Sequence, residues 1–599
     1  MLYFGLRWNP CTGAGNILTW IKKPTGAILP VPGDARLRYG RLMAVEDSSY
    51  DAVVVGAGAG GGFAAMALAD AGLRVLLLER GERFVPQRDF PMRHRDWELH
   101  ADVFPPKGAD PSIELVPGTP LEPGSQELCS RGAGVLPDSQ CARRGPFRYE
   151  RVFGLGGTTL HYQGEAHRFA DFAFKPARSY GFGVDWPIGY DELEPYYKRV
   201  EHVLGVAGSN DNPFKPPRGD FPTPAHPLSL ASQHVRRGAA ELGWSLLPNS
   251  LALPSKSIDG RPPCQHTGGC VQGCIFGAKS SVDLTALLRA QRTGRLSIRT
   301  GTRVLQLDHD GRRVRSLICA SAKGATRVRA RAVVLAAGAV ETPRLLLSSQ
   351  APGFPRGLAN NHDLVGRYFL DTLLAALTVR FEERLNPYKG PPIDSRIWNF
   401  SRPDASGPVR SGYVLGTSGT LGGFQGPLSY ALAIPGIGLA HKRSMRERFA
   451  TILTLFGIAE HEPRAENRLT LGDRVDEAGI PRVKVESGFS AADRAAFKSM
   501  IQRCGQWAQA CRAAETVALA STYSDPAASH VGGGCRMGKD PEASVVDSHG
   551  RTHDVPNLFV ADASVLVGQG AGDSPSLTIQ ALALRTAEHI AALMKRREL

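Results

Sequence analysis

The stretch that most constrains the fold is residues 50–81, which read YDAVVVGAGAGGGFAAMALADAGLRVLLLERG. The apolar, β-branched run over residues 50–55 predicts a buried parallel strand. Residues 59–70 read as a helix, and residues 73–78 form a second apolar run. A strand, a helix and a strand in this order predict a βαβ unit, and therefore an α/β fold.

Three glycines join the first strand to the helix in the pattern G-x-G-x-x-G. Gly56 permits the tight turn, Gly58 lets backbone approach a pyrophosphate, and Gly61 lets the helix pack closely on the strand. Glu79 ends the second strand, where a carboxylate accepts hydrogen bonds from a ribose. The competing interpretations are a structural glycine turn and a membrane span. The many glycines and Asp70 argue against a membrane helix, and the complete unit predicts a dinucleotide site.

The length and charge of the chain bound its class. Its 599 residues are too many for one core, so we expect two domains or one large domain with insertions. A net charge of +14 favours anionic partners such as FAD, acidic substrates, acidic subunits or membrane surfaces. The Lys and Arg residues are scattered, which argues against nucleic acid as a partner. A solvated basic surface is the simplest interpretation.

The sequence shows no recognisable secretory signal or membrane span. Ten cysteines in a chain of this length are not a secreted disulfide framework. We therefore expect a cytoplasmic protein without an integral membrane segment, and a peripheral membrane association stays open. Residues 1–42 are rich in Gly and Pro, and they are read either as a disordered arm or as a segment before a translation start at Met43.

Two further glycine segments could abut the same ligand. Gly156 and Gly157 allow close backbone approach, and Thr158 adds a hydroxyl group. A buried strand over residues 332–337 turns through Gly338 into a helix, which repeats the strand–glycine–helix pattern.

The last seventy residues carry a second signal. His530 opens a glycine turn, and a later strand ends in the acid Asp562. The loop over residues 568–575 then leads into a helix over residues 576–594, whose start could hold an anion or a flavin carbonyl.

Periodicity predicts the elements between these segments. An amphipathic helix follows a Pro-containing turn within residues 185–206, and a second helix covers residues 489–515. Strands are expected over residues 302–308 and 314–320. The alternating pattern from residue 371 to about 490 predicts a mostly antiparallel sheet.

In combination and in order, these segments resemble the glucose–methanol–choline (GMC) family of flavin oxidoreductases. Residues 185–217 and 264–279 are more similar to its bacterial gluconate and glucose-3-dehydrogenase branch, and somewhat similar to its cholesterol and long-chain alcohol oxidases. The resemblance implies a Rossmann-like FAD-binding domain and a discontinuous substrate domain on a mostly antiparallel sheet. The expected division is 1–47 (N-terminal extension), 48–165, 285–370 and 526–599 (FAD-binding domain), 166–284 (substrate or cap segment) and 371–525 (substrate-binding domain).

The resemblance also implies the residues that hold FAD. The first glycine unit and Glu79 would hold ADP, and Gly156 to Thr158 would lie along the pyrophosphate and the flavin. Asp562, with residues 572–579, would face the ribityl chain and isoalloxazine. The full set of expected cofactor-binding residues is Gly56, Gly58, Gly61, Glu79, Gly156, Gly157, Thr158, His161, Val304, Asp562 and Ser574.

His530 matches the active-site histidine of the family. Hydride leaves a C–H bond for flavin N5 as the adjacent hydroxyl gives up its proton, and an imidazole with a pKa near neutral suits that transfer. The competing interpretation is a histidine that only packs near a glycine turn.

The second catalytic position departs from the family, which usually has Asn or His before the proline. This chain has Asp573-Ser574-Pro575 instead. We include Ser574 and Asp573 in the catalytic site. Asp573 is the better candidate for a helix cap, and Ser574 is the better candidate for a substrate contact.

Two further features are ambiguous. Some relatives carry an iron–sulfur cluster on a segment similar to the one with Cys264, Cys270 and Cys274. Four thiolates are the usual ligand set and only three are local, so we expect free thiols and no metal. In some members a histidine at the position of His161 bonds covalently to the flavin, but we expect non-covalent FAD here.

The predicted function is the FAD-dependent oxidation of a CH–OH group in a sugar, polyol or sterol-like alcohol. The alternatives are a flavin-fold lyase, isomerase or photoenzyme without net oxidation, and a non-catalytic flavin-binding subunit. The sequence leaves the substrate, the oligomeric state and the electron acceptor (oxygen, quinone or a redox subunit) open.

Overall fold

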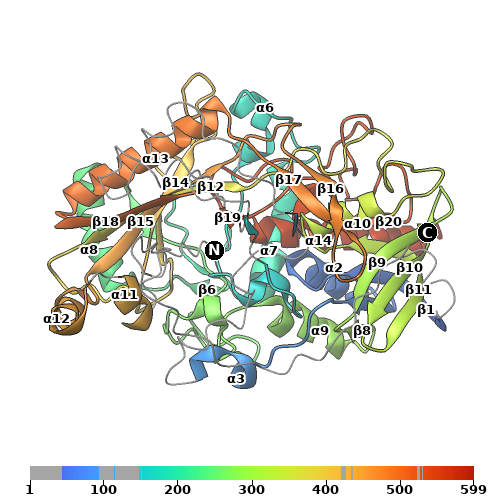
Figure 1. Ribbon diagram of the computed structural model, residues 1–599, viewed down its shortest axis with the longest axis horizontal. Coiled ribbons are helices and arrows are strands. Elements are labelled where there is room, and N and C mark those ends of the chain that lie inside the picture. The colour runs from blue at the N-terminus through green and yellow to red at the C-terminus, as the bar shows by residue number, and fades with distance from the viewer. Residues whose placement is uncertain are drawn as a thin grey trace, which may run out of the picture.

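A computed structural model describes residues 44–93, 113–114, 148–149, 151–216, 218–419, 427–433, 436–522, 527–528 and 530–599. The predictions for residues 1–42 lie outside these ranges. Figure 1 shows two lobes side by side. One lobe is built on a mixed sheet and the other on an antiparallel sheet.

The mixed sheet has the strand order β8-β2-β1-β11-β10-β9, with β20 beside β11. Its parallel strands are β8 (Leu296–Arg299), β2 (Val75–Leu78), β1 (Ala44–Val55), β11 (Gly324–Leu335) and β20 (Leu558–Val560). Two antiparallel strands, β9 (Arg303–His309) and β10 (Val314–Ser321), extend it on the far side of β11. Segments more than 500 residues apart thus share one sheet, because β20 pairs with the end of β11 next to β1.

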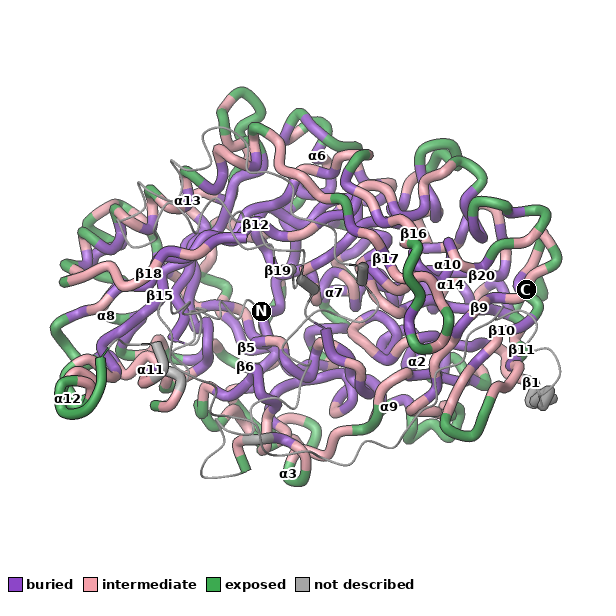
Figure 2. Tube along the Cα trace, viewed as in Figure 1, coloured by how far each residue is buried: buried purple, intermediate pink, exposed green. Residues whose placement is uncertain are grey.

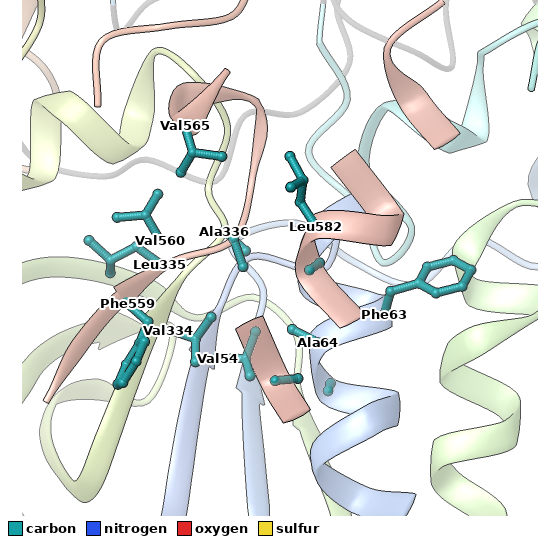
Figure 3. Packing of buried hydrophobic residues seen from close by; sticks show 14 of the residues in the cluster. Val54, Phe63, Ala64, Val334, Leu335, Ala336, Phe559, Val560, Val565 and Leu582 are labelled. Atoms are coloured by element: carbon teal, nitrogen blue, oxygen red, sulfur yellow. The ribbon is translucent and has the colours of Figure 1, made fainter. Parts of the chain in front are cut away.

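Helices pack on the part of this sheet where the side chains of the strands are apolar and buried. α2 spans Ala59–Asp70, as predicted, and it packs between α9 (Ala286–Arg292) and α14 (Ser576–Lys595). The predicted amphipathic helix is α7 (Tyr190–Leu204), which packs on α14. Figure 3 shows the resulting core between the strand ends and the helices.

The second lobe is a six-stranded antiparallel sheet covered by α13 (Ala491–Ala510) and α8 (Leu230–Glu241). Its strands, in spatial order, are β18 (Glu515–Ser521), β12 (Thr372–Arg380), β15 (Ile452–Glu460), β14 (Tyr413–Ser418), β13 (Ser395–Ile397) and β7 (Leu246–Pro248). Side chains alternate along β12 with a period of two. Leu373 and Ala375 face the helices, whereas Leu374 and Ala376 belong to a separate apolar cluster on the opposite face.

The antiparallel sheet predicted from residue 371 is present, but its run is interrupted. Two helices, α11 (Pro427–Ala433) and α12 (Gly438–Arg448), lie between β14 and β15. Periodicity did not reveal α12, because none of its side chains is fully buried and its sequence, GLAHKRSMRER, carries no continuous apolar stripe. Figure 2 shows it as an exposed helix at the edge of the molecule. The last two strands of this stretch, β16 (Arg468–Val475) and β17 (Pro481–Glu486), do not join the large sheet and form a separate small sheet with β3 (Ile113–Glu114).

Short elements complete the described chain. They are β4 (Arg148–Tyr149) with β19 (Ala527–Ala528), β5 (Ala207–Gly208) with β6 (Thr223–Pro224), α3 (Pro86–Asp89), α6 (Pro176–Ser179), α10 (Glu341–Ser348) and the 3₁₀ turns Pro91–Arg93, Gly157–Leu160, Asp171–Phe174, Cys270–Gln272, Val282–Leu284 and Ala563–Val565. Among the residues that the structure describes, no helix combines the length and the apolar character needed to cross a bilayer.

Replacing Gly60 by Ala is expected to destabilise the fold. A Cβ atom at this position of α2 would overlap the carbonyl oxygen of Ala561, which follows β20. Overpacking of this kind costs about 1–3 kcal/mol. The matched control is Gly505→Ala in α13, where a Cβ atom meets nothing within 4 Å. A helical Gly→Ala change without a clash stabilises by about 0.5–1 kcal/mol. Thermal unfolding measures both variants, and equal melting temperatures would contradict the packing argument.

Candidate active site

The first glycine unit forms a bare backbone surface at the start of α2. Gly56 has a φ of +98°, and a Cβ atom there would overlap the carbonyl oxygen of Ala336 at the end of β11. A Cβ atom on Gly61 would overlap the carbonyl oxygen of Gly56, so the helix packs directly on the turn. Gly58 differs, because a Cβ atom there would meet nothing within 4 Å. The helix N-terminus therefore opens onto free space next to Gly58, where its unpaired N–H groups can bind an anion.

A second glycine segment closes one side of this space. The N–H of Gly156 donates to the carbonyl oxygen of Ala57 at 3.1 Å. A Cβ atom on Gly157 would lie 2.7 Å from the Cα atom of Gly58, so only glycine allows this backbone-to-backbone contact. Thr158 follows within the 3₁₀ turn Gly157–Leu160. The two predicted glycine segments thus lie against each other and form one cradle, which fits an extended diphosphate.

Glu79 lies at the end of β2 beside this cradle. Its carboxylate accepts hydrogen bonds from the N–H groups of Ala57 at 2.9 Å and Gly81 at 2.8 Å. Burial raises the pKa of Glu79 to about 7. The N–H of Thr302 donates to the carbonyl oxygen of Glu79 at 2.9 Å, which places Val304, two residues further along, near the same strand end.

Asp562 connects the C-terminal segment to the second strand–glycine–helix junction. Its carboxylate accepts hydrogen bonds from the N–H of Gly338 at 2.9 Å and the hydroxyl group of Thr342 at 2.6 Å. The N–H and the hydroxyl group of Ser564 donate to its other oxygen at 2.8 and 2.6 Å. Because four protein donors occupy this carboxylate, Asp562 organises the backbone around the cradle.

His161 ends the second glycine segment and is buried. Burial lowers the pKa of His161 well below its usual value, so the ring is neutral. The neighbouring segment is fixed by Lys279, whose ammonium group donates to the carbonyl oxygens of Leu160 at 2.7 Å, Tyr162 at 3.2 Å and Cys270 at 2.5 Å. Lys279 therefore fastens the cysteine segment to the glycine segment that carries His161.

Cys264, Cys270 and Cys274 are free thiols that line one small cavity together with Lys279. Burial raises the pKa of Cys264 to about 11 and that of Cys270 to about 12, which favours the neutral thiol form of both. Within the described ranges, no group of three His, Cys, Asp or Glu side chains has an arrangement that could hold a metal ion.

His530 lies opposite the end of the antiparallel sheet. Its Nδ1 atom is 3.1 Å from the hydroxyl oxygen of Thr372, the first residue of β12. Thr372, Leu374 and Ala376 lie on one face of β12 by the period of two, so the apolar cluster on that face borders the site. Burial lowers the pKa of His530 to about 3. The ring is therefore a weaker base than the near-neutral imidazole expected from the sequence.

Glu460, at the end of β15, fixes the loop that precedes α14. This buried carboxylate accepts hydrogen bonds from the N–H groups of Gln569 at 2.7 Å and Ala571 at 3.0 Å, and burial raises its pKa to about 7. The side chain of Gln569 donates to the carbonyl oxygen of His530. These bonds join His530 to the loop that presents Ser574.

Asp573 forms an ion pair, and its predicted role as a helix cap is wrong. Its carboxylate binds the ammonium group of Lys215 and accepts a hydrogen bond from the indole of Trp398 at 3.2 Å. α14 begins at Ser576 without a side-chain cap. The attraction of a buried cation exceeds that of the helix end, so Asp573 turns toward Lys215.

A buried histidine supports the same turn. The N–H of Ser574 donates to His167 Nδ1 at 3.0 Å, and His167 Nε2 lies 2.7 Å from the amide oxygen of Asn249. This pattern requires a neutral ring with its proton on Nε2, and burial lowers the pKa of His167 accordingly. No hydrogen bond of the Ser574 hydroxyl group is found within the described part of the chain.

The network continues to a buried ion pair. Asn249 donates to Glu165 at 2.8 Å, and Glu165 binds Arg396 of β13 through contacts of 2.6–2.8 Å. Burial would raise the pKa of Glu165, but Arg396 outweighs this effect and the pKa falls to about 2. Sequence reasoning missed the residues of this network and the residues that hold the loop: Glu165, His167, Lys215, Asn249, Thr372, Arg396, Trp398, Glu460 and Gln569. Lys215 and Gln569 lie in segments singled out above, but nothing in those segments indicates their contacts, and no local motif marks the others.

The chain matches the family described as GMC oxidoreductase in two parts, over residues 180–372 and 463–583. Residues 51–87 match a family described as an FAD binding domain. The pyridoxine 4-oxidase from Mesorbium loti shares the fold, with a TM-score of 0.62 at 20% identity, over 90% of this chain and 99% of that one.

Two curated relatives match nearly end to end. The 2-methyl-1,2-propanediol dehydrogenase of Mycolicibacterium austroafricanum is 30% identical over 92% of this chain and 96% of its own length. The fructose dehydrogenase large subunit of Gluconobacter japonicus is 31% identical over 92% of this chain and 99% of its own length. With these matches, the glycine cradle and His530, the chain belongs to the GMC oxidoreductase family and is an FAD-dependent oxidoreductase.

Proposed function

We propose that the protein oxidises a CH–OH group of a sugar, polyol or sterol-like alcohol, with His530 as the base. The observation that carries the proposal is the pairing of His530 with Thr372 beside a loop that presents the Ser574 hydroxyl group. The relatives named above include a diol dehydrogenase and a fructose dehydrogenase subunit. Bound FAD supplies the hydride acceptor. We find no feature that favours a lyase, a photoenzyme or a non-catalytic subunit.

The residues of the cradle would each contact a different part of FAD. The α2 N-terminus, Gly58 and Gly157 would hold the pyrophosphate, because they leave bare backbone around free space. The carboxylate of Glu79 would accept hydrogen bonds from the ribose hydroxyl groups. The backbone of Val304 would lie near the adenine of FAD. Asp562 would act through the backbone that it organises, since protein donors occupy its carboxylate. His161 is assigned to the isoalloxazine side, and a non-covalent FAD stays a prediction.

His530 can accept a proton through one nitrogen only. When Nδ1–H donates to Thr372, the lone pair of Nε2 is free, and no other hydrogen bond to this ring is found among the described residues. That tautomer lets Nε2 take the proton of a substrate hydroxyl as the C–H bond breaks. The Ser574 hydroxyl group would orient the same substrate oxygen, and Asp573 would position Ser574 through Lys215 and Trp398.

Anaerobic mixing with a panel of polyols, sugars and sterols tests the function. At least one alcohol is expected to bleach the absorbance of the bound flavin and to be recovered as the carbonyl compound. Reoxidation with oxygen and with a quinone, in parallel, then distinguishes an oxidase from a dehydrogenase. An intact yellow protein that no alcohol reduces would contradict the proposal and favour the non-oxidative alternatives.

Replacing His530 by Ala is expected to slow flavin reduction by about 10²–10⁴-fold, because a general base is lost. The variant should remain yellow, since the cradle is unchanged. In the parent enzyme, a pKa of about 3 keeps His530 neutral at higher pH. The rate is therefore expected to fall only well below pH 6.5 as the ring becomes protonated. A loss of rate centred near pH 6.5 would contradict the buried, neutral base.

Ser574→Ala and Asp573→Asn are expected to differ in what they damage. Ser574→Ala removes one hydrogen bond to substrate, worth about tenfold in rate, and leaves the melting temperature unchanged. Asp573→Asn leaves Lys215 buried without its counter-ion, which costs about 3–5 kcal/mol of stability. Thermal unfolding and stopped-flow flavin reduction measure both effects. A loss of stability in Ser574→Ala together with a loss of rate alone in Asp573→Asn would contradict these roles.

A further inference from the structure

The most exposed large apolar side chains among the described residues lie together at the start of α12. Ile437 is 89% exposed and Leu439 is 83% exposed. The preceding sequence is also apolar, since residues 431–440 read ALAIPGIGLA without a charge. Figure 1 shows α12 at the edge of the antiparallel lobe, far from the mixed sheet. Single exposed apolar residues are common on protein surfaces, but two that are exposed next to each other form a patch, and apolar patches rimmed by polar residues mark sites that meet a protein or a membrane.

The rest of the helix divides into two faces. His441, Ser444, Met445 and Arg448 are partly buried, and Met445 packs toward Tyr430 and Ile452. The opposite face carries Leu439, Lys442, Arg443 and Arg446, which are spaced i, i+3, i+4 and i+7 and are all exposed. Within the described residues, none of these three cations forms an ion pair, and Glu447 is the one acid of α12. We call the exposed face, with Ile437, the α12 face.

We propose that the α12 face docks on an anionic lipid bilayer. Ile437 and Leu439 can enter the boundary between headgroups and acyl chains, and the three cations one and two turns further along then meet lipid phosphates. Juxtamembrane Lys and Arg residues each gain from an anionic surface, and the effect adds to the burial of aliphatic carbon. The proposal is independent of the substrate assigned above.

A protein partner fits the α12 face less well. Protein interfaces bury about 800 Å² per partner, and they are enriched in aromatic residues, Met and Arg and depleted of Lys. An eleven-residue helix is about 16 Å long and here offers two aliphatic side chains and three cations. The face is too small and lacks the aromatic residue that anchors a protein interface, whereas aliphatic groups beside Lys and Arg suit an anionic bilayer surface.

Co-sedimentation of the FAD-loaded protein with vesicles tests the proposal. The probes are phosphatidylcholine vesicles and vesicles of phosphatidylcholine mixed with phosphatidylglycerol. The protein is expected to bind the mixed vesicles, to bind the neutral vesicles far more weakly, and to dissociate as salt rises. I437S/L439S is expected to weaken binding by roughly tenfold or more, and K442E/R443E/R446E by roughly 100-fold or more.

The matched control is R292E/R295E/K323E, which makes the same charge change on exposed residues of the mixed-sheet lobe. It should bind nearly as the parent does, because charges beyond a Debye length of about 10 Å from the bilayer are screened. All variants should keep the parental rate of flavin reduction by a soluble alcohol, which shows that they are folded. In Leu439→Trp, vesicles that contain brominated lipid should quench a larger fraction of the Trp fluorescence than they do in the parent protein.

Three results would overturn the proposal. One is the absence of binding to either vesicle, and another is an equal loss of binding in the control and in the α12 variants. The third is a doubled solution mass that I437S/L439S abolishes while vesicle binding is absent, which would assign the face to a second copy of the chain.

Discussion

Close contact between backbones at the start of α2 is the constraint on which the rest of the structure depends. Gly157 touches Gly58, and Gly60 meets the carbonyl group of Ala561, without side chains between them. These contacts bring three distant stretches of the chain to one helix N-terminus. Since that end carries unpaired N–H groups and the positive end of the helix dipole, the fold places these stretches around a position that favours an anion.

The end of the site that carries His530 and Ser574 depends on buried charge, whereas the cradle depends on bare backbone. Asp573 with Lys215, and Glu165 with Arg396, form two ion pairs bridged by His167 and Asn249. A buried pair adds little net stability, but losing one partner is costly, so such pairs hold a single geometry. Glu460 contributes similarly by fixing the loop through backbone N–H groups. The turn at Ser574 is thus fixed without an amide side chain at the family position.

Features that depend on contacts between residues close in the sequence could be predicted, whereas those that depend on distant segments could not. The β1–α2–β2 unit rests on contacts within about thirty residues, and there the predicted helix matches α2 residue for residue. β1 nevertheless begins at Ala44 and not at Tyr50, because pairing with β11 extends it beyond its apolar run. His530 is marked by its glycine turn. Lys215 and Arg396 carry no such mark, since their partners come from segments hundreds of residues away.

Burial, and not the nearby ion pair, is the main cause of the low pKa of His530. Glu165 raises its pKa and Arg396 lowers it, so the two charges, which bind each other, act in opposite directions at His530. Burial then governs the proton affinity of the ring, which explains a pKa that falls to about 3 despite a carboxylate nearby. The Glu165–Arg396 ion pair therefore serves to hold neighbouring side chains in place more than to set the pKa of His530. A substrate that completes the cover over His530 keeps the ring neutral, whereas water admitted beside it would raise its pKa toward the ordinary value.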